Sequence, residues 1–418
     1  MKNKEIETSY FILAPYAFFV KGARRGALYD VKNGQVFAVN AEAVPVVEQL
    51  EKGATFEELR KINYDLDNKE ILDFLLLLKK NKLITSSPYS KKWKISPPKT
   101  LLKFIWVEVT RRCNLKCIHC YVNSNSCSNE QNYTTKLKSE NWVEVIKDAH
   151  SLGAEAIQFI GGEPFLMKGS ELLNLVKKTK DLGYKFIEIF TNCTLLNEEI
   201  LDFLTKYNVA IATSVYGNRA EIHDAVTQIQ GSFNNTIQNI EKILKRGIKL
   251  RVGIVEVGLN KPYLNETVQF LERLGVKKIK IDSVRPAGKA LQFYKEKNFL
   301  NTNFKQKQLP YFSKFSYEFF SRVHYYHNCF GDKVCITDSG EVLPCIMARN
   351  IILGNVLTNS LKDILIKSKE IRELTKDKIE KCKDCEFRYC CFDCRIKAMW
   401  PNKKLISAPT ECNYNPYI

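Results

Sequence analysis

The sequence predicts an α/β protein built around an open, partial barrel of six strand units. Three observations lead to this fold class: short apolar strands alternate with amphipathic helices between residues 104 and 284, a small α+β region precedes them, and a cysteine-rich region follows. Repeated strand-helix units build a parallel sheet through right-handed crossovers. Because 418 residues are too many for one ordinary core, we expect domains at residues 1–85, 104–325 and 326–418, with a linker at 86–103.

The first domain is predicted from one strand pattern and two helix patterns. Short apolar runs between residues 10 and 40, separated by Gly22, Gly26 and Gly34, predict a three-stranded meander. The segments ATFEELRKINYD and LDNKEILDFLLLLKKNKLI have the period of amphipathic helices. The stretch SSPYSKKWKISPPKT that follows is rich in Ser, Pro and Lys, which is typical of a linker.

The barrel is predicted from six apolar segments, five of which are followed by an amphipathic helix pattern. The predicted strands are FIWVEVT, AIQFI, KFIEIF, VAIATSV, LRVGIVEV and KKIKIDSV. In barrels of this kind the chemistry lies on the loops at the carboxyl ends of the strands. Candidate functional residues are therefore sought directly after these six segments.

Three cysteines in the loop after the first strand, Cys113, Cys117 and Cys120, are the most informative residues of the chain. Three thiolates in one tight loop can hold a 4Fe-4S cube by three of its irons, which leaves the fourth iron open for a small molecule. A zinc knot or a chance cluster is the alternative that spacing alone leaves open.

The C-x3-C-x2-C spacing, followed one strand later by GGEP, resembles the radical SAM enzymes. The resemblance implies that the open iron binds S-adenosylmethionine. In this family the backbone and the glutamate of GGEP receive the methionyl ammonium, and glycine lets the backbone approach closely. The cofactor-binding residues implied by the motif are Gly161, Gly162, Glu163 and Pro164.

Three further strand ends carry looser family motifs. TNCTLL resembles TNGTLL and places Asn192 near the ribose, with Cys193 where glycine is usual. SVYG resembles S-x-D-G and makes Ser214 a candidate for the adenosine or carboxylate side, although Tyr216 replaces the aspartate. Arg285 in VRPAGKA is expected to reach the cofactor carboxylate or the substrate. No residue of the sequence is identified as the catalytic base.

The cysteines after the barrel resemble the SPASM domain, whose pattern holds two auxiliary 4Fe-4S clusters. Carried over by position, the resemblance assigns one cluster to Cys329, Cys335, Cys345 and Cys394, and the other to Cys382, Cys385, Cys391 and Cys412. Both clusters would be fully ligated, which suits electron transfer. Zinc ribbons also use C-x2-C pairs. Cys390 is the spare cysteine of this region if Cys391 is the ligand. We interpret Cys127 and Cys193 as plain thiols.

The amino-terminal region resembles the winged-helix, PqqD-like domains that hold leader peptides, with a plain structural cap as the alternative. The whole chain thus resembles radical SAM/SPASM peptide maturases. The resemblance implies cleavage of S-adenosylmethionine to a 5'-deoxyadenosyl radical and oxidation of a ribosomally made precursor peptide, with a thioether crosslink as the expected product. The alternatives are an enzyme of the anaerobic sulfatase-maturating type and a SPASM enzyme that acts on a small molecule.

Composition and charge bear on partners and location. The net charge of +18 suggests an acidic partner, which could be nucleic acid, an anionic membrane surface or an acidic peptide. The basic residues are spread along the chain, which makes a dedicated nucleic-acid surface less favoured and leaves a generally basic protein as the alternative. No segment has the ~20 consecutive apolar residues of a membrane span, and cysteine usage favours metal binding in a reducing cytoplasm. The family resemblance adds a leader-bearing peptide, a reducing flavodoxin or ferredoxin, and an ATP-grasp ligase as expected partners.

Overall fold

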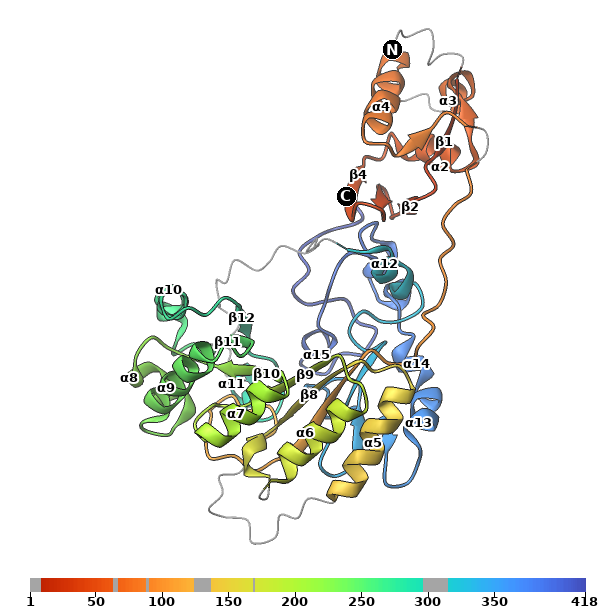
Figure 1. Ribbon diagram of the computed structural model, residues 1–418. Helices are drawn as coiled ribbons and strands as arrows, with labels where there is room; N and C mark the ends of the chain where they lie inside the picture. Colours follow the sequence, from red (N-terminus) through yellow and green to blue (C-terminus); the bar gives the residue numbers. More distant parts are fainter. Residues whose placement is uncertain (1–8, 63–66, 88–89, 124–136, 168–169, 296–314) are drawn as a thin grey trace. The chain divides into compact units, whose positions relative to one another are not determined.

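The computed structural model describes residues 9–62, 67–87, 90–123, 137–167, 170–295 and 315–418 (Figure 1). Cys127 lies outside these ranges. The chain divides into two compact units. The first unit combines Met1–Lys99, Phe304–Asn328 and Glu373–Ile418, and the second combines Thr100–Asn303 with Cys329–Arg372. The cysteine-rich region is therefore shared between the two units, which are described separately.

The second unit contains a mixed sheet in the order β12-β11-β10-β9-β8-β7-β13-β14-β15. The six predicted barrel strands are confirmed and run parallel: β7 Phe104–Thr110, β8 Ala156–Gly161, β9 Phe186–Phe190, β10 Ala210–Ser214, β11 Leu250–Glu256 and β12 Ile279–Ser283. The sequence did not predict that the sheet continues. Strand β13 (Lys333–Ile336) pairs in parallel with β7, and β14 (Glu341–Leu343) and β15 (Gly354–Asn355) extend it antiparallel.

Amphipathic helices connect the parallel strands, and α5, α6 and α7 lie along one face of the sheet (Figure 1). Helix α6, for example, buries Leu172, Leu175 and Val176 on one side. The helices of this unit are α5 Ser139–Ser151, α6 Glu171–Asp181, α7 Glu198–Lys206, α8 Ala220–Thr227, α9 Ser232–Lys245, α10 Leu264–Arg273, α11 Ala290–Lys295, α13 Leu361–Lys367 and α14 Lys369–Arg372. Helix α8 has no counterpart among the predicted elements.

The first unit contains two small antiparallel sheets. The predicted meander is β2 Ala17–Lys21, β3 Gly26–Asp30 and β4 Gln35–Val39. Strand β1 (Tyr10–Leu13) instead pairs with β5 (Ala54–Thr55) and β6 (Ile84–Thr85). The helices are α2 Val44–Lys52, α3 Phe56–Ile62, α4 Asn68–Lys80, α12 Tyr317–Val323 and α15 Arg395–Ala398.

Strand β3 is buried along its whole length because both faces of its sheet are covered. On one face, Leu28 packs in a core with residues of α2, α3 and α4. On the other face, Tyr29 packs with Phe320 and Tyr389, and its hydroxyl donates to the carbonyl oxygen of Glu386 at 2.8 Å. The amino-terminal sheet and the last cysteine-rich segment therefore share one hydrophobic core.

Candidate active site

The three-cysteine loop begins after β7, at the carboxyl end of the first barrel strand. Cys113 is buried, and Cys117 and Cys120 are half-buried. Burial raises the pKa of the Cys113 thiol, and the neighbouring Cys117 and Cys120 sulfurs raise it further. Burial likewise raises the pKa of Cys117 to about 12, again with Cys120 contributing. Two of the three thiols, Cys113 and Cys117, therefore ionise less readily than a free thiol, and the irons of a cube would supply the positive charge that stabilises their thiolates.

Backbone contacts hold the loop in place. The amides of Lys116 and Ile118 donate to the carbonyl oxygens of Thr227 and Val226 at the end of α8, both at 3.0 Å. The carbonyl of Cys120 accepts from the Lys289 amide at 2.9 Å. Gly288, with φ 57°, lies so close to the Cys120 carbonyl that a Cβ would overlap it. Helix α8, which sequence reasoning missed, is thus part of the loop's support.

The two glycines of GGEP let two backbone segments approach closely. A Cβ on Gly161 would overlap the carbonyl of Thr110, and a Cβ on Gly162 would overlap that of Arg112. The amides of Gly162 and Glu163 donate to these same two carbonyls at 2.7 and 2.8 Å. The motif therefore joins the end of β8 to the chain that leads into Cys113.

Glu163 is fully buried and ties strand ends together. Its carboxylate accepts from the Phe165 amide (3.1 Å), the Thr191 hydroxyl (2.7 Å) and the Asn192 amide (2.8 Å). Burial raises the pKa of Glu163 to about 7, although these three donors oppose the shift. Its predicted contact with the methionyl ammonium stays a prediction, and the geometry gives the carboxylate a supporting function in addition.

Asn192 lies in a closed set of amide and hydroxyl contacts beside the cluster loop. Its Nδ2 donates to Asn114 Oδ1 at 2.7 Å, and its Oδ1 accepts from the Thr194 hydroxyl at 2.7 Å. Asn114 Nδ2 donates back to Thr194 Oγ1 at 2.7 Å. Because Asn114 follows Cys113 directly, the segment after β9 supports the first predicted cluster ligand. Sequence reasoning missed Asn114 and Thr194.

Cys193 occupies the glycine position of the family motif and keeps a glycine-like backbone. Its φ is 63°, in the left-handed region that glycine adopts most easily. The Cys193 side chain is buried, and the backbone carbonyl of Cys193 accepts a hydrogen bond from Asn239 Nδ2 at 2.7 Å. The turn that the family motif requires is therefore preserved without glycine.

Ser214 lies at the end of β10, and Arg285 lies just after β12, as the sequence predicted. Ser214 is half-buried and its hydroxyl contacts that of Tyr216, whose pKa is raised by burial. Arg285 Nη2 donates to both carboxylate oxygens of Asp282 at 3.0 Å. Burial would raise the pKa of Asp282, but the Arg285 and Lys280 cations together outweigh burial and the net pKa is lowered. Contacts of Ser214 and Arg285 with a cofactor remain predictions.

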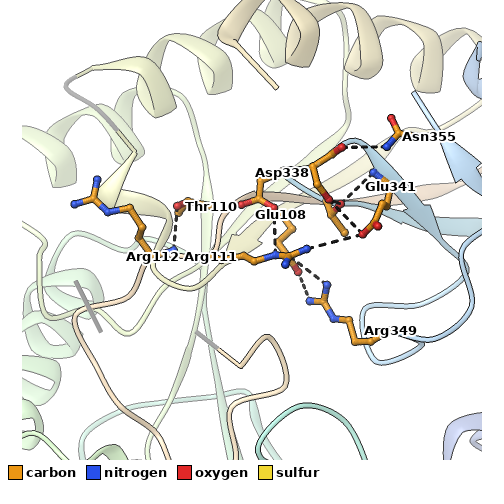
Figure 2. Close-up of polar contacts among 10 residues, drawn as sticks. Glu108, Thr110, Arg111, Arg112, Asp338, Glu341, Arg349 and Asn355 are labelled. Atoms are coloured by element: carbon orange, nitrogen blue, oxygen red, sulfur yellow. Dashed lines mark hydrogen bonds and ion pairs between the residues drawn. The ribbon is translucent and has the colours of Figure 1, made fainter. Parts of the chain in front are cut away.

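An ionic network around the buried Glu108, which the sequence did not predict, connects β7 to the segment after residue 329 (Figure 2). Glu108 is fully buried on β7, and its carboxylate accepts two hydrogen bonds from the Arg349 guanidinium. One joins Nη1 to Oε1 at 3.2 Å, and the other joins Nη2 to Oε2. Arg111 Nε lies 3.8 Å from the same carboxylate and 3.3 Å from Asp338. The Arg349 guanidinium also lies 5.1 Å from the ring centre of Tyr121, the residue after Cys120. The only sequence signal was a glutamate inside an apolar strand.

The predicted ligands of the first auxiliary cluster are divided between the two units. Cys335 lies on β13 opposite Trp106 of β7, and burial raises its pKa, with Glu108 contributing. Cys329 and Cys345 belong to the same unit as Cys335, whereas Cys394 belongs to the first unit. The grouping of these four cysteines therefore stays a prediction.

The predicted ligands of the second auxiliary cluster all belong to the first unit. Burial raises the pKa of Cys382 to about 11 and that of Cys385 to about 12. The Cys391 sulfur contributes to both of these shifts. Cys390 is buried in the core that contains Tyr29, and its thiol donates to the Phe387 carbonyl at 3.3 Å. The Cys390 thiol is also influenced by Cys391 and Cys385, so the choice of Cys391 as the ligand stays a prediction.

Within the described ranges, no three His, Cys, Asp or Glu side chains are arranged around a point where one metal ion would sit. The ligands of a cube bind separate irons and lie further apart than the ligands of a single ion. Among the described helices, none is long and apolar enough to cross a membrane.

Comparison with known families agrees with this geometry. The radical SAM superfamily matches residues 107–274, and the SPASM iron-sulfur cluster-binding domain matches residues 329–386. The chain is therefore a radical SAM enzyme that uses a 4Fe-4S cluster and S-adenosylmethionine. More particularly, it belongs with the radical SAM enzymes that carry a SPASM domain and resembles their peptide maturases.

Three similar proteins illustrate the range of this group. The chain is 28% identical to AlbA, the subtilosin biosynthesis protein of Bacillus subtilis, over 71% of this chain and 68% of AlbA. It is 24% identical to an AdoMet-dependent heme synthase of Oleidesulfovibrio alaskensis, over 74% of this chain and 86% of the synthase. The fold matches SuiB of Streptococcus suis, solved bound to its precursor peptide SuiA, with a TM-score of 0.56 and 14% identity. The match covers 97% of this chain and 100% of SuiB.

Proposed function

We propose that this enzyme oxidises a ribosomally synthesised precursor peptide and closes a thioether between a cysteine sulfur and a carbon of the same peptide. The observation that carries the proposal is the similarity to AlbA, a bacteriocin biosynthesis protein, over about seven-tenths of the chain. A sheet-and-helix domain at the amino terminus, where peptide maturases hold the leader of their substrate, supports it.

The proposed ligands of the cluster that binds S-adenosylmethionine are Cys113, Cys117 and Cys120. When bound, this group supplies a 5'-deoxyadenosyl radical that removes hydrogen from a carbon of the peptide. The protein's part is to hold the reactants: the GGEP backbone, Asn192, Ser214 and Arg285 are the proposed contacts to the cofactor. Glu163 and Asn114 keep the strand ends and the loop in register.

The reaction also needs an outlet for one electron. Forming a thioether from a thiol and a carbon–hydrogen bond removes two hydrogen atoms, and the radical accepts only one of them. The thiol hydrogen leaves as a proton, and the remaining electron would pass to the two auxiliary clusters. We propose that these are held by Cys329, Cys335, Cys345 and Cys394, and by Cys382, Cys385, Cys391 and Cys412. A flavodoxin or ferredoxin is the proposed external redox partner, and an ATP-grasp ligase is a proposed companion enzyme.

The proposed leader-binding edge is strand β4, and residues 1–85 are the proposed recognition domain. Among the described residues, β4 pairs only with β3, and its Gln35 and Ala38 are exposed. The other outer strand, β2, already has two carbonyls occupied: Lys92 donates to Ala17, and Arg388 donates to Lys21 at 3.0 Å. An extended leader would therefore add beside β4, where main-chain pairing holds a peptide without reading every side chain.

The basic residues near this sheet differ in their availability to an acidic leader. Lys21 pairs with Glu48 at 2.7 Å, and Arg25 lies 3.8 Å from the buried Glu386. Arg24 and Lys32 are exposed and are the better candidates for contact with the leader. Any electrostatic preference for an acidic leader should weaken as salt is raised.

The direct test is to look for a short cysteine-containing reading frame beside the gene of this enzyme, to co-express its peptide with the enzyme, and to weigh the product by mass spectrometry. We expect a loss of two hydrogen atoms for each crosslink, at a cysteine that alkylating reagents no longer modify. An unmodified peptide, in a preparation that still cleaves S-adenosylmethionine, would contradict the proposal.

A second candidate, action on a small molecule, is favoured by one observation: the match to the heme synthase covers 86% of that synthase at 24% identity. The same preparation distinguishes the two candidates. Incubation with an iron porphyrin precursor should leave that precursor unchanged if the substrate is a peptide.

A further inference from the structure

A cluster of buried charges lies beside the predicted ligands of the second auxiliary cluster. Lys376 is 3% exposed, Asp393 is 1% exposed and Arg395 is fully buried. Both cations form ion pairs with the one carboxylate of Asp393. Lysine and arginine are almost never buried to this degree unless they are paired, so this arrangement needs an explanation.

The charges of this cluster do not balance without another anion. Lys376 and Arg395 are two cations, whereas Asp393 is one anion. His327 Nε2 lies 3.8 Å from Asp393 Oδ1, and a proton there would only enlarge the positive excess. Leaving a buried cation uncompensated is strongly destabilising, so the site should contain a further negative charge.

The geometry indicates where that negative charge lies. Lys376 Nζ is 4.0 Å from the Cys382 sulfur. Asp393 and the sulfurs of Cys382 and Cys391 act electrostatically on Lys376, and both Lys376 and Arg395 act on Cys382. The excess cation therefore faces thiols that we have assigned to the second auxiliary cluster, and a cube held by four thiolates is a buried anion.

We propose that Lys376 and Arg395, held in place by Asp393, are positioning residues that raise the reduction potential of the second auxiliary cluster; this rests on the cluster assignment of the proposed function. Reduction adds one negative charge to a cluster that is already anionic. A fixed cation stabilises the reduced form more than the oxidised form, and in a buried site water screens this attraction weakly. Charge and hydrogen bonds at the sulfurs are established determinants of cluster potential.

The reducing electron in the test comes from the chemical titrant, so no reaction of the peptide is involved. The background is the triple variant Cys113→Ala, Cys117→Ala, Cys120→Ala, in which only the auxiliary clusters remain. The readout is the midpoint potential of each cluster, measured by anaerobic redox titration with electron paramagnetic resonance.

In this background, Lys376→Met should lower the reduction equilibrium constant of one cluster about tenfold, which is about 59 mV for a one-electron couple. The other auxiliary cluster should not change. Lys376→Arg keeps the positive charge, so its midpoint potential should stay close to that of the parent background. Lys383→Met is the matched control because Lys383 is exposed and follows Cys382 directly, so its removal should move the midpoint by much less.

Iron content separates the possible failures. The parent background should bind about eight irons, and a value near four would refute the cluster assignment itself. Full iron content with the same midpoint in Lys376→Met and parent would overturn only the role given to Lys376. If Lys376→Met loses iron, Asp393→Asn decides: removing the carboxylate should raise the midpoint, and an unchanged or lowered midpoint would overturn the proposal.

Discussion

Replacing Arg349 with methionine should destabilise the second unit because it leaves the Glu108 carboxylate buried without its main partner. Breaking a buried ion pair by removing one member typically costs about 3–5 kcal/mol. We expect the lower end, about 3 kcal/mol, because Arg111 remains 3.8 Å from Glu108 and the Arg349 side chain is 22% exposed. The change should appear as a lower urea midpoint of the cluster-free protein, followed by tryptophan fluorescence.

Arg219 provides a matched control for this change. It also pairs with carboxylates, Glu221 at 3.9 Å and Glu266 at 4.0 Å, and it also lies over a tyrosine ring, at 4.7 Å. Its side chain is 48% exposed, and exposed pairs contribute about 0–1 kcal/mol. Adding Glu108→Gln to Arg349→Met should recover most of the loss. Equal effects of Arg349→Met and Arg219→Met would refute the reasoning.

Three other predictions concern the clusters and Glu163. Anaerobic reconstitution should give about twelve irons per chain, and zinc in the carboxyl-terminal region would contradict the assignment. Replacing Cys113, Cys117 and Cys120 with alanine should abolish cleavage of S-adenosylmethionine, whereas Cys345→Ala with Cys382→Ala should retain part of the cleavage and lose peptide modification; equal loss of both activities in folded protein would count against this division. Because burial raises the pKa of Glu163 from 4.5 to about 7, the folded state binds the extra proton, and this residue's contribution to stability should fall as pH rises through that interval. The measurement is the urea midpoint of the parent and of Glu163→Gln at several pH values. The difference, parent minus variant, should fall as pH rises, and a difference that does not change with pH would speak against this role of Glu163.

The sequence was sufficient for the parts of the fold that local patterns encode. The six barrel strands follow from apolar segments of strand length separated by helix-period segments, and the cluster loop follows from cysteine spacing. Pairing between distant segments carries no local signal. The sequence therefore predicted neither the parallel pairing of β13 with β7 nor the departure of Tyr10–Leu13 from the meander.

The supporting residues of the site were missed for the same physical reason. Glu108 and Arg349 are 241 positions apart, and Lys376 lies in a lysine-rich stretch that looks like ordinary solvated surface. Only folding shows that one lysine of that stretch is buried against Asp393 and Cys382. The shared core around Tyr29 also changes the design of experiments, because deleting residues 1–85 would expose Phe387 and Tyr389. Substitutions of exposed residues, such as Arg24→Glu, are therefore the better test of leader binding.

The most direct test of the central claim follows hydrogen from the peptide to the cofactor. The precursor peptide is prepared with deuterium on the carbon that becomes crosslinked, and the anaerobic reaction is analysed by mass spectrometry. The account predicts deuterium in 5'-deoxyadenosine, together with a peptide that has lost one deuterium from carbon and one hydrogen from its cysteine thiol. Deuterium-free 5'-deoxyadenosine alongside crosslinked peptide would contradict it.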